Sequence, residues 1–377
     1  MTGPRTSQGI AAGSVDISHA RRGRGEEGSD APLNLSSSPS IDQFLHDVPK
    51  VELHLHLVGS ASPSTVAALV DRHGDTHVPR DPETLSDFFE FRDFPHFIEV
   101  YASVNDLVRD AEDVVSVVRG AAADLESHRV RYAEMTVTPY MHEIRGLAPG
   151  DLLEALAEGR RLALQLHGVE LAWIFDIPGE HGQKAAQRTV ELVLDDGVDG
   201  LIGFGLAGAE AGVNRADYAW AFDKARAAGL RSVPHAGEGD GPESVWAAID
   251  VLRADRIGHG VRAIEDPTLV TALAERAIPL EVCPSSNVCT RVFESIDRHP
   301  IVDLHRQGVV VTINTDDPHM FGTNLSEEYR RVAACFGLRH DDVADLVKNG
   351  IRSSFMSTDR RGILLREVDQ ALGAIAK

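Results

Sequence analysis

The stretch Lys50-Val-Glu-Leu-His-Leu-His-Leu57 is a short apolar run that carries two histidines near its end. Residues two apart in a β-strand face the same side, so the rings of His54 and His56 would point together. A pair of this kind often arises by chance or for packing, so alone it says little about a metal. It does direct attention to the ends of the other apolar runs.

Seven further apolar runs follow, and most are separated by helix-like stretches such as 154–166 and 218–228. The expected strands are Val51–Leu57, Val130–Val137, Glu170–Asp176, Leu201–Leu206, Arg231–His235, Arg256–Val261, Ile278–Cys283 and Val309–Asn314. Eight alternating units over about 310 residues favour an α/β fold, a closed (β/α)8 TIM barrel, with a doubly wound open sheet as the alternative.

The positions of polar residues decide between these two folds. His56, His235, His259 and Asp316 all fall at the C-terminal ends of expected strands. Barrels of this type carry their catalytic residues at that end of the strands. The pattern therefore favours the barrel.

Composition limits the class of protein. The 377 residues are 43% hydrophobic and 25% charged, which is typical of a globular chain. A net charge of −21 disfavours binding to nucleic acid polymers or anionic membranes. Three cysteines make no disulfide framework, and no run of about 20 apolar residues occurs. Cytoplasmic residence fits best, and the oligomeric state stays open.

The first 40 residues have a different composition from the rest. Gly, Ser, Arg and Pro dominate this segment, which shows no apolar periodicity. We expect a disordered N-terminal tail over residues 1–40 and a single barrel domain over residues 41–377.

The first connection between expected strands, from Ser60 to His128, is unusually long and predicts a helical insertion after strand 1. Its middle is dense in large apolar side chains: Leu85, Phe88, Phe89, Phe91, Phe94 and Phe97. One interpretation is a helix pair that buries its own core over the barrel mouth. The other is an apolar lid over a substrate, and both can hold together.

His54, His56, His235 and Asp316 together form a set of three imidazoles and one carboxylate. Such a set suits zinc with one position left open for water, with iron or cobalt as possible substitutes. Barrel hydrolases with two metals often bridge them by a modified lysine at the end of strand four, and no lysine lies near 201–208. One ion is therefore expected.

Three residues near these ligands could act on a substrate. Glu238 could donate a proton to a ring nitrogen if burial raises its pKa, although a glutamate at a helix N-terminus is the alternative. His259 could orient or deprotonate the water, or be a core histidine bonded to backbone. Asp317 could meet the substrate, although an Asp-Asp-Pro turn also explains it.

Five stretches together resemble the adenosine deaminase family. They are Lys50–Leu57, Gly203-Phe-Gly-Leu-Ala-Gly208, His235-Ala-Gly-Glu238, Arg256-Ile-Gly-His-Gly260 and Asn314-Thr-Asp-Asp-Pro318, in the family's order. The resemblance implies a (β/α)8 barrel with one zinc ion on His54, His56, His235 and Asp316.

The resemblance also implies roles in the hydrolytic deamination of a 6-aminopurine nucleoside. Glu238 would donate a proton to purine N1, while His259 would act on the water that attacks C6 and expels ammonia. Asp317 would receive a hydrogen bond from the N7 side of the purine, and the Gly208 backbone would contact N3. The partner is then a small-molecule purine nucleoside.

The chain departs from the family pattern at three polar positions. Val58 replaces the aspartate that bonds the ribose 5′-hydroxyl, and Gly205 and Ala209 replace two further aspartates. Chemistry should survive, since none is a metal ligand or a proton carrier. An unbonded hydroxyl against Val58 would cost roughly 1–3 kcal/mol, so an apolar 5′-substituent would be preferred there.

These departures resemble the branch that deaminates 6-amino-6-deoxyfutalosine, a menaquinone precursor with an aryl ketone and a carboxylate. Arg92 is a candidate cation for that carboxylate, although a solvated helix position is the favoured interpretation. Plain adenosine deaminase is the main alternative. Another amidohydrolase reaction and a non-catalytic nucleoside-binding protein are the others.

Overall fold

The structure is a computed structural model, and it describes residues 40–74, 76–195 and 197–375. The predicted tail lies outside the described residues, apart from Ser40. The described residues belong to one compact unit.

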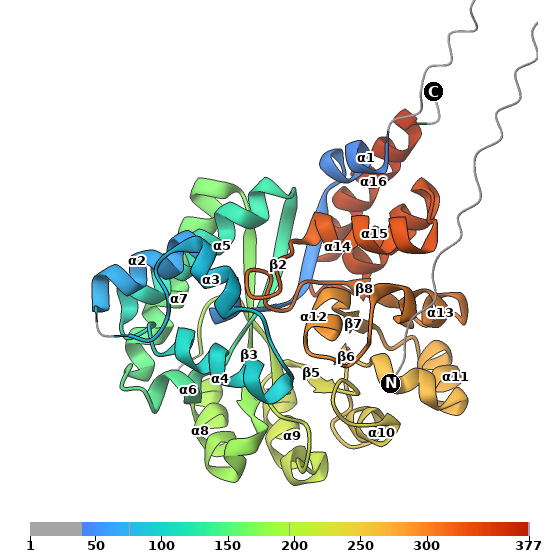
Figure 1. The fold of residues 1–377 in the computed structure, drawn as a ribbon. Coiled ribbons are helices and arrows are strands. Elements are labelled where there is room, and N and C mark those ends of the chain that lie inside the picture. Colours follow the sequence, from blue (N-terminus) through green and yellow to red (C-terminus); the bar gives the residue numbers. More distant parts are fainter. Residues whose placement is uncertain (1–39, 75, 196, 376–377) are drawn as a thin grey trace, which may run out of the picture. The chain divides into compact units, whose positions relative to one another are not determined.

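Eight strands form one sheet in chain order, and each pairs in parallel with the next (Figure 1). They are β1 (Lys50–His56), β2 (Val130–Val137), β3 (Glu170–Pro178), β4 (Leu201–Ala207), β5 (Arg231–Ala236), β6 (Ile257–His259), β7 (Leu280–Val282) and β8 (Val311–Ile313). All eight lie where they were predicted, and the last three are shorter than predicted.

The two edges of the sheet meet just beyond β8. Asp316 forms a parallel bridge with Leu55 of β1. Its N–H donates to the carbonyl of His54 at 2.9 Å, and its carbonyl accepts from the N–H of His56 at 3.0 Å. The prediction of a (β/α)8 barrel is therefore confirmed, and the open-sheet alternative is wrong.

Helices connect the strands and surround them (Figure 1). The α-helices are α1 (Ile41–Asp47), α2 (Pro63–His73), α3 (Pro82–Phe88), α4 (Phe94–Asn105), α5 (Ala111–Ser127), α6 (Pro139–Glu143), α7 (Pro149–Leu162), α8 (Gly182–Asp195), α9 (Ala219–Ala227), α10 (Pro242–Asp250), α11 (Pro267–Arg276), α12 (Pro284–Cys289), α13 (Ile301–Arg306), α14 (Leu325–Phe336), α15 (His340–Ser353) and α16 (Thr358–Ile375). The short helical turns are η1 (Val58–Ser60), η2 (Ala163–His167), η3 (Gly179–His181), η4 (Arg215–Tyr218), η5 (Val261–Glu265) and η6 (Ile296–Arg298).

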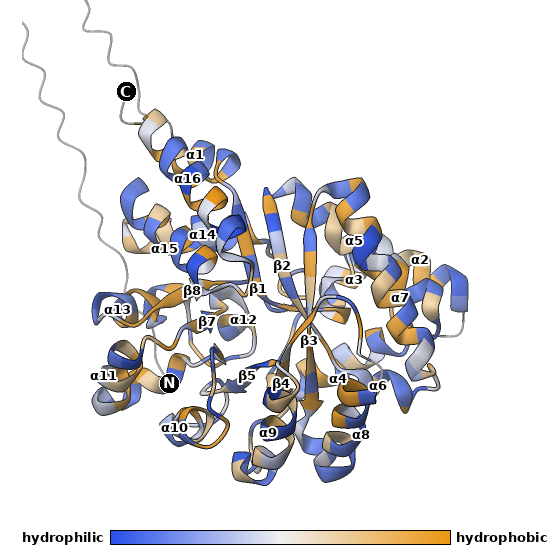
Figure 2. Cartoon of the chain, turned by 180° about the vertical axis from the view of Figure 1, so that it is seen from behind, coloured by the Kyte–Doolittle hydropathy of each residue, from blue (hydrophilic) through white to orange (hydrophobic). Residues whose placement is uncertain are grey.

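Local sequence explains where many helices begin. Ser62 caps α2 by accepting a hydrogen bond from the N–H of Thr65, and Pro63 occupies the first turn, where its missing N–H costs nothing. Figure 2 shows hydrophilic and hydrophobic residues alternating on α7 and α8, as expected of helices with one face on a core. Among the described helices, none combines the length and apolarity needed to cross a membrane.

The insertion after β1 contains four helices, α2 to α5, rather than a pair. Phe97 is buried against Phe91 and Phe321, with ring centroids 5.3 and 5.2 Å apart, so part of the aromatic segment builds its own core. Phe97 also lines a cavity at the strand ends, together with Phe94 and Ile98 of α4. Both interpretations of the segment thus hold in part, and α4 is the wall that the insertion adds to the barrel mouth.

Candidate active site and metal centre

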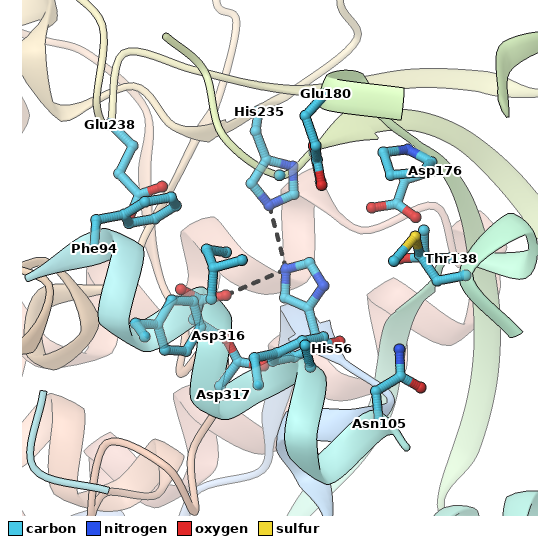
Figure 3. A pocket seen from close by; sticks show the side chains of 18 of the residues that line it. His56, Phe94, Asn105, Thr138, Asp176, Glu180, His235, Glu238, Asp316 and Asp317 are labelled. Carbon is cyan, nitrogen blue, oxygen red and sulfur yellow. Dashed lines mark hydrogen bonds and ion pairs between the residues drawn. The ribbon is translucent and has the colours of Figure 1, made fainter. Parts of the chain in front are cut away.

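The four predicted metal ligands come together at the C-terminal ends of three strands. His54 and His56 lie on β1, His235 lies on β5, and Asp316 follows β8. The Nε2 atoms of His56 and His235 are 3.3 Å apart. Oδ1 of Asp316 lies 3.2 Å from Nε2 of His56 and 3.5 Å from Nε2 of His54 (Figure 3).

These distances fit a shared ion. With bonds of about 2.1 Å to a tetrahedral metal, donor atoms lie roughly 3.4 Å apart. Nε2 of His54 is buried and has no hydrogen-bond partner among the described residues. The donor atoms of His54, His56 and His235 all lie within 4.8 Å of one another. The residues therefore suit one zinc-type ion.

The ligands are held by neighbours that the sequence analysis missed. Glu281 of β7 accepts a hydrogen bond from Nδ1 of His54 at 3.0 Å, which leaves Nε2 of that ring for the metal. Ser286 of α12 donates to Oδ2 of Asp316 at 2.7 Å. The strand-end rule applied to the histidines could have pointed to both, since Glu281 lies one residue before the end of β7 and Ser286 lies four residues beyond it, in α12.

A buried ion-pair network continues below His54. Nε of Arg256 donates to Oε1 of Glu281 at 2.5 Å, and its Nη2 pairs with Glu134 of β2. All three side chains are at most 1% exposed. Glu281 thus has a cation on one side and a predicted metal ligand on the other, which fixes its orientation.

Glu238 is buried beside the ligands, and burial raises the pKa of its carboxyl well above the usual range. The charges of Asp316 and Glu210 raise it further. Glu238 therefore keeps a proton that it can donate.

Glu210 fixes the loop that carries Glu238. Oε2 of Glu210 accepts from the N–H groups of Glu238 and Asp240 at 3.1 and 2.6 Å, while Arg215 donates to its Oε1 at 2.8 Å. Of the acidic positions in the fourth-strand motif, this retained one holds the loop of the predicted proton donor.

The protonation of His259 follows from a chain of hydrogen bonds behind it. The N–H of Ile301 donates to Nδ1 of His299 at 3.2 Å, so a neutral His299 carries its proton on Nε2. That proton goes to Oδ1 of Asn287 at 3.1 Å, and the amide of Asn287 then donates to Nδ1 of His259 at 3.2 Å.

His259 is consequently a donor toward the ligands. Burial lowers its pKa to about 3, so the ring is neutral, and its proton sits on Nε2. This atom lies 3.6 Å from Oε2 of Glu238 and 3.7 Å from Oδ2 of Asp316. The arrangement favours orientation of a water over its deprotonation. A φ of +59° at His259, together with +65° at Asp316, places backbone strain at this site.

Asp317 is buried, and burial together with the charge of Asp316 raises the pKa of its carboxyl well above the usual range. A protonated carboxyl donates a hydrogen bond. N7 of a 9-substituted purine carries a lone pair and no hydrogen, so donation suits it. The contact of Asp317 with a purine stays a prediction, with Asp317 as the donor rather than the acceptor.

One cavity connects the ligands to α4. Its walls include His56, His235, Glu238, His259, Asp316 and Asp317 at one end, together with Gly208 after β4. Gly208 has φ +87°, and a Cβ there would lie 2.1 Å from Oε2 of Glu180, so glycine leaves its backbone open to a ligand.

Val58 and Arg92, two residues predicted to contact a substrate, are not among the described residues that line the cavity. Val58 is buried at the start of η1 and is not among the described residues that line the cavity, so its contact with a substrate stays a prediction. Arg92 is exposed, in line with the favoured interpretation of a solvated position. Arg145, which no sequence pattern marked, lines the cavity instead.

The chain is similar to proteins of known family. The family model described as adenosine deaminase matches residues 49–371. The aminodeoxyfutalosine deaminase of Streptomyces coelicolor is 47% identical over 371 residues, which cover 97% of this chain and 96% of that protein.

Two solved structures are similar. Adenine deaminase from Arthrobacter aurescens has a TM-score of 0.83 at 30% identity, covering 86% of this chain and 99% of that one. An amidohydrolase from Burkholderia ambifaria with bound Zn has a TM-score of 0.81 at 28% identity, covering 89% of this chain and 94% of that one.

Proposed function

Because the chain belongs to the adenosine deaminase family, we propose that it hydrolyses the 6-amino group of a 5′-modified purine nucleoside, 6-amino-6-deoxyfutalosine, and releases ammonia. This is the substrate in the name of the Streptomyces coelicolor relative, and it belongs to menaquinone biosynthesis. Deamination of adenosine to inosine in purine salvage is the less specific alternative.

The observation that carries the proposal is the lining of the cavity. Predicted metal ligands line it together with Arg145 and with Phe94, Phe97 and Ile98 of α4. Arg145 is the one lysine or arginine among its described lining residues. Asp106 accepts from its Nε at 2.6 Å, and the Met141 carbonyl accepts from its Nη1 at 3.0 Å, so the guanidinium is oriented.

This lining matches the proposed substrate better than it matches adenosine. An aryl group would bury apolar area against α4, and its carboxylate would pair with Arg145. Adenosine has neither group.

The chain's own residues position the reaction. A single Zn²⁺ on His54, His56, His235 and Asp316 would supply Lewis acidity that makes water nucleophilic at neutral pH. His259 donates a hydrogen bond that orients the water oxygen toward C6 of the purine. The Gly208 backbone contacts N3.

Proton transfer completes the exchange of groups at C6. Glu238 protonates N1, which draws electrons away from C6 as the C–O bond forms. Asp317 donates to N7 and holds the ring. One proton of the water then passes to the amino group as the C–N bond breaks, and the other returns to the Glu238 carboxylate, so water and the aminopurine nucleoside become the 6-oxo product and ammonia.

A substrate panel tests the proposal. The panel compares 6-amino-6-deoxyfutalosine with adenine, adenosine, 5′-deoxyadenosine and methylthioadenosine. The ratio kcat/KM should be highest for 6-amino-6-deoxyfutalosine. Metal analysis of the same preparation should give about one zinc-type ion per chain. A higher kcat/KM for adenosine or adenine would overturn the proposed substrate, and two ions per chain would overturn the single-metal site.

The proposal also includes a small-molecule partner, no nucleic acid polymer, no membrane and cytoplasmic residence. The charge of −21 and three free cysteines support these points. Gel filtration would supply the oligomeric state.

A further inference from the structure

The wall of the cavity contains a buried carboxylate. Asp176 near the end of β3 is 1% exposed and lines the cavity. Neither of its carboxylate oxygens meets the geometry of a hydrogen bond to a described residue, although the Thr138 hydroxyl lies near enough to offset part of the rise in pKa that burial causes. Burying polar atoms without partners costs free energy, so such a group at a cavity wall points to a ligand that donates hydrogen bonds.

The position of Asp176 identifies which part of a ligand it would meet. In Figure 3 it lies with Thr138 on the side of His56 away from Glu238, while Glu180 lies between it and His235. Thr138 and Glu180 also line the cavity. With N1 of a purine at Glu238, the group attached to the far side of the base would extend toward these residues.

The neighbouring strand leaves room for this carboxylate. Asp176 pairs in register with Gly205 of β4. A Cβ at Gly205 would lie 3.2 Å from Cβ of Asp176 and 3.0 Å from the carbonyl oxygen of Val233. A side chain at position 205 would therefore crowd Asp176. Glycine at this position leaves room for the Asp176 side chain to face the cavity.

We propose that Asp176 binds the vicinal 2′- and 3′-hydroxyls of the substrate ribose. The inference rests on the proposed function in taking the ligand to be a purine nucleoside. Two carboxylate oxygens side by side accept from two adjacent hydroxyls, which are the donors a nucleoside offers beyond its base. Asp176 is thus a specificity residue that separates ribonucleosides from deoxynucleosides.

The test is a cycle of two enzymes and two substrates. The substrates are 6-amino-6-deoxyfutalosine and its 2′,3′-dideoxy analogue, and the enzymes are the unmodified chain and Asp176→Ala. Loss of hydrogen bonds to a charged acceptor should lower kcat/KM about 10–100-fold for either single change. Once the hydroxyls are gone, Asp176→Ala should add little further loss.

A purely electrostatic effect of Asp176 on His56 would behave differently. Asp176→Ala would then slow the dideoxy analogue as much as the ribonucleoside, and this result would overturn the inference. So would an unmodified enzyme that does not distinguish the two substrates, a measurement that needs no variant. Asp176→Asn, which keeps the size of the side chain, covers the case in which Asp176→Ala does not fold.

A control variant and a second substrate pair complete the design. Asp223 on α9 has a side chain that is 61% exposed, so Asp223→Asn should leave every rate unchanged. Adenosine and 2′,3′-dideoxyadenosine repeat the cycle without a 5′-substituent. If the loss caused by Asp176→Ala depends on the ribose hydroxyls in both pairs but adenosine is the better substrate, the proposed substrate is wrong and the role of Asp176 stands. If the loss does not depend on the hydroxyls but the 5′-modified substrate is the better one, the role of Asp176 is wrong and the proposed substrate stands.

Discussion

Single side chains at this site have their chemistry set by burial. Glu238 and His259 move in opposite directions from their usual pKa values, one upward and the other downward, because burial disfavours the charged form of each. The outcome is a neutral acid and a neutral imidazole facing one another across 3.6 Å. Both can donate a proton or a hydrogen bond to a reacting purine without first changing charge.

Glu238→Gln should keep the fold and the metal while kcat falls by about 10²–10⁴-fold. Glutamine has the same shape but no acidic proton for N1. Steady-state kinetics, metal analysis and a thermal melt measure the three quantities. Glu275→Gln, on an exposed position of α11, is the matched control. Near-normal turnover by Glu238→Gln would show that Glu238 is not the proton donor.

Arg145→Met should lower kcat/KM for 6-amino-6-deoxyfutalosine by about 10–100-fold, because the substrate carboxylate loses a charged donor. The rate with 5′-deoxyadenosine, which has no carboxylate, should hardly change. Arg92→Met replaces an exposed arginine of the same segment and should affect neither substrate. Equal losses on both substrates would mean that Arg145 acts on the fold rather than on the carboxylate.

At the scale of elements, the strands place side chains of the site at or near their C-terminal ends, and different strands provide residues with different roles. β1 and β5 provide imidazole ligands, while β7 provides the carboxylate that orients one of them. α4 crosses the same end and gives the cavity its apolar wall. A ligand on one strand therefore depends on a side chain that follows more than two hundred residues later.

Glu281→Gln should weaken metal binding by about 10–100-fold, because the amide no longer draws the His54 proton to Nδ1 as strongly. It should also destabilise the fold, since Arg256 loses one of two buried carboxylates. Glu134→Gln removes the other carboxylate of Arg256 without touching His54. It should destabilise the fold similarly but keep metal affinity.

Chelator titration measures metal affinity for both variants, and thermal melts measure stability. Equal loss of metal from Glu134→Gln and Glu281→Gln would assign the effect to general destabilisation. It would then not reflect the orientation of His54.

At the scale of the whole molecule, α1 is the point where the barrel begins. Ser40 caps this helix by accepting from the N–H of Gln43 at 3.2 Å, and Phe44 and Leu45 are buried. Residues before Ser40 lack the apolar surface that would compensate for the entropy of ordering them.

A chain that begins at Ser40 should therefore melt and turn over like the full chain. A chain that begins at Val48 would lose the two buried side chains of α1 and should melt several degrees lower. Differential scanning calorimetry and kcat/KM compare the three proteins. A clear loss on removal of the first 39 residues alone would show that this segment contributes to the fold or the pocket.

The sequence alone was enough for the barrel, its eight strands and the grouping of the metal ligands. The reason is that strand periodicity and strand ends are local properties, and in a parallel barrel all C-terminal ends meet at one mouth. His54, His56, His235 and Asp316 could be grouped without coordinates for that reason. Asp176 and Glu281 also lie near the C-terminal ends of their strands, so the same argument could have identified them.

Tertiary packing alone decided which other side chains reach the cavity. Val58 directly follows the β1 motif, yet it begins η1, is buried and is not among the described residues that line the cavity, so its contact with a substrate stays a prediction. Arg145 lines the cavity although it lies in the turn after α6, and Arg92 of the aromatic segment does not. The path of an insertion depends on contacts between distant segments, such as Phe97 against Phe321, and no local pattern encodes such contacts.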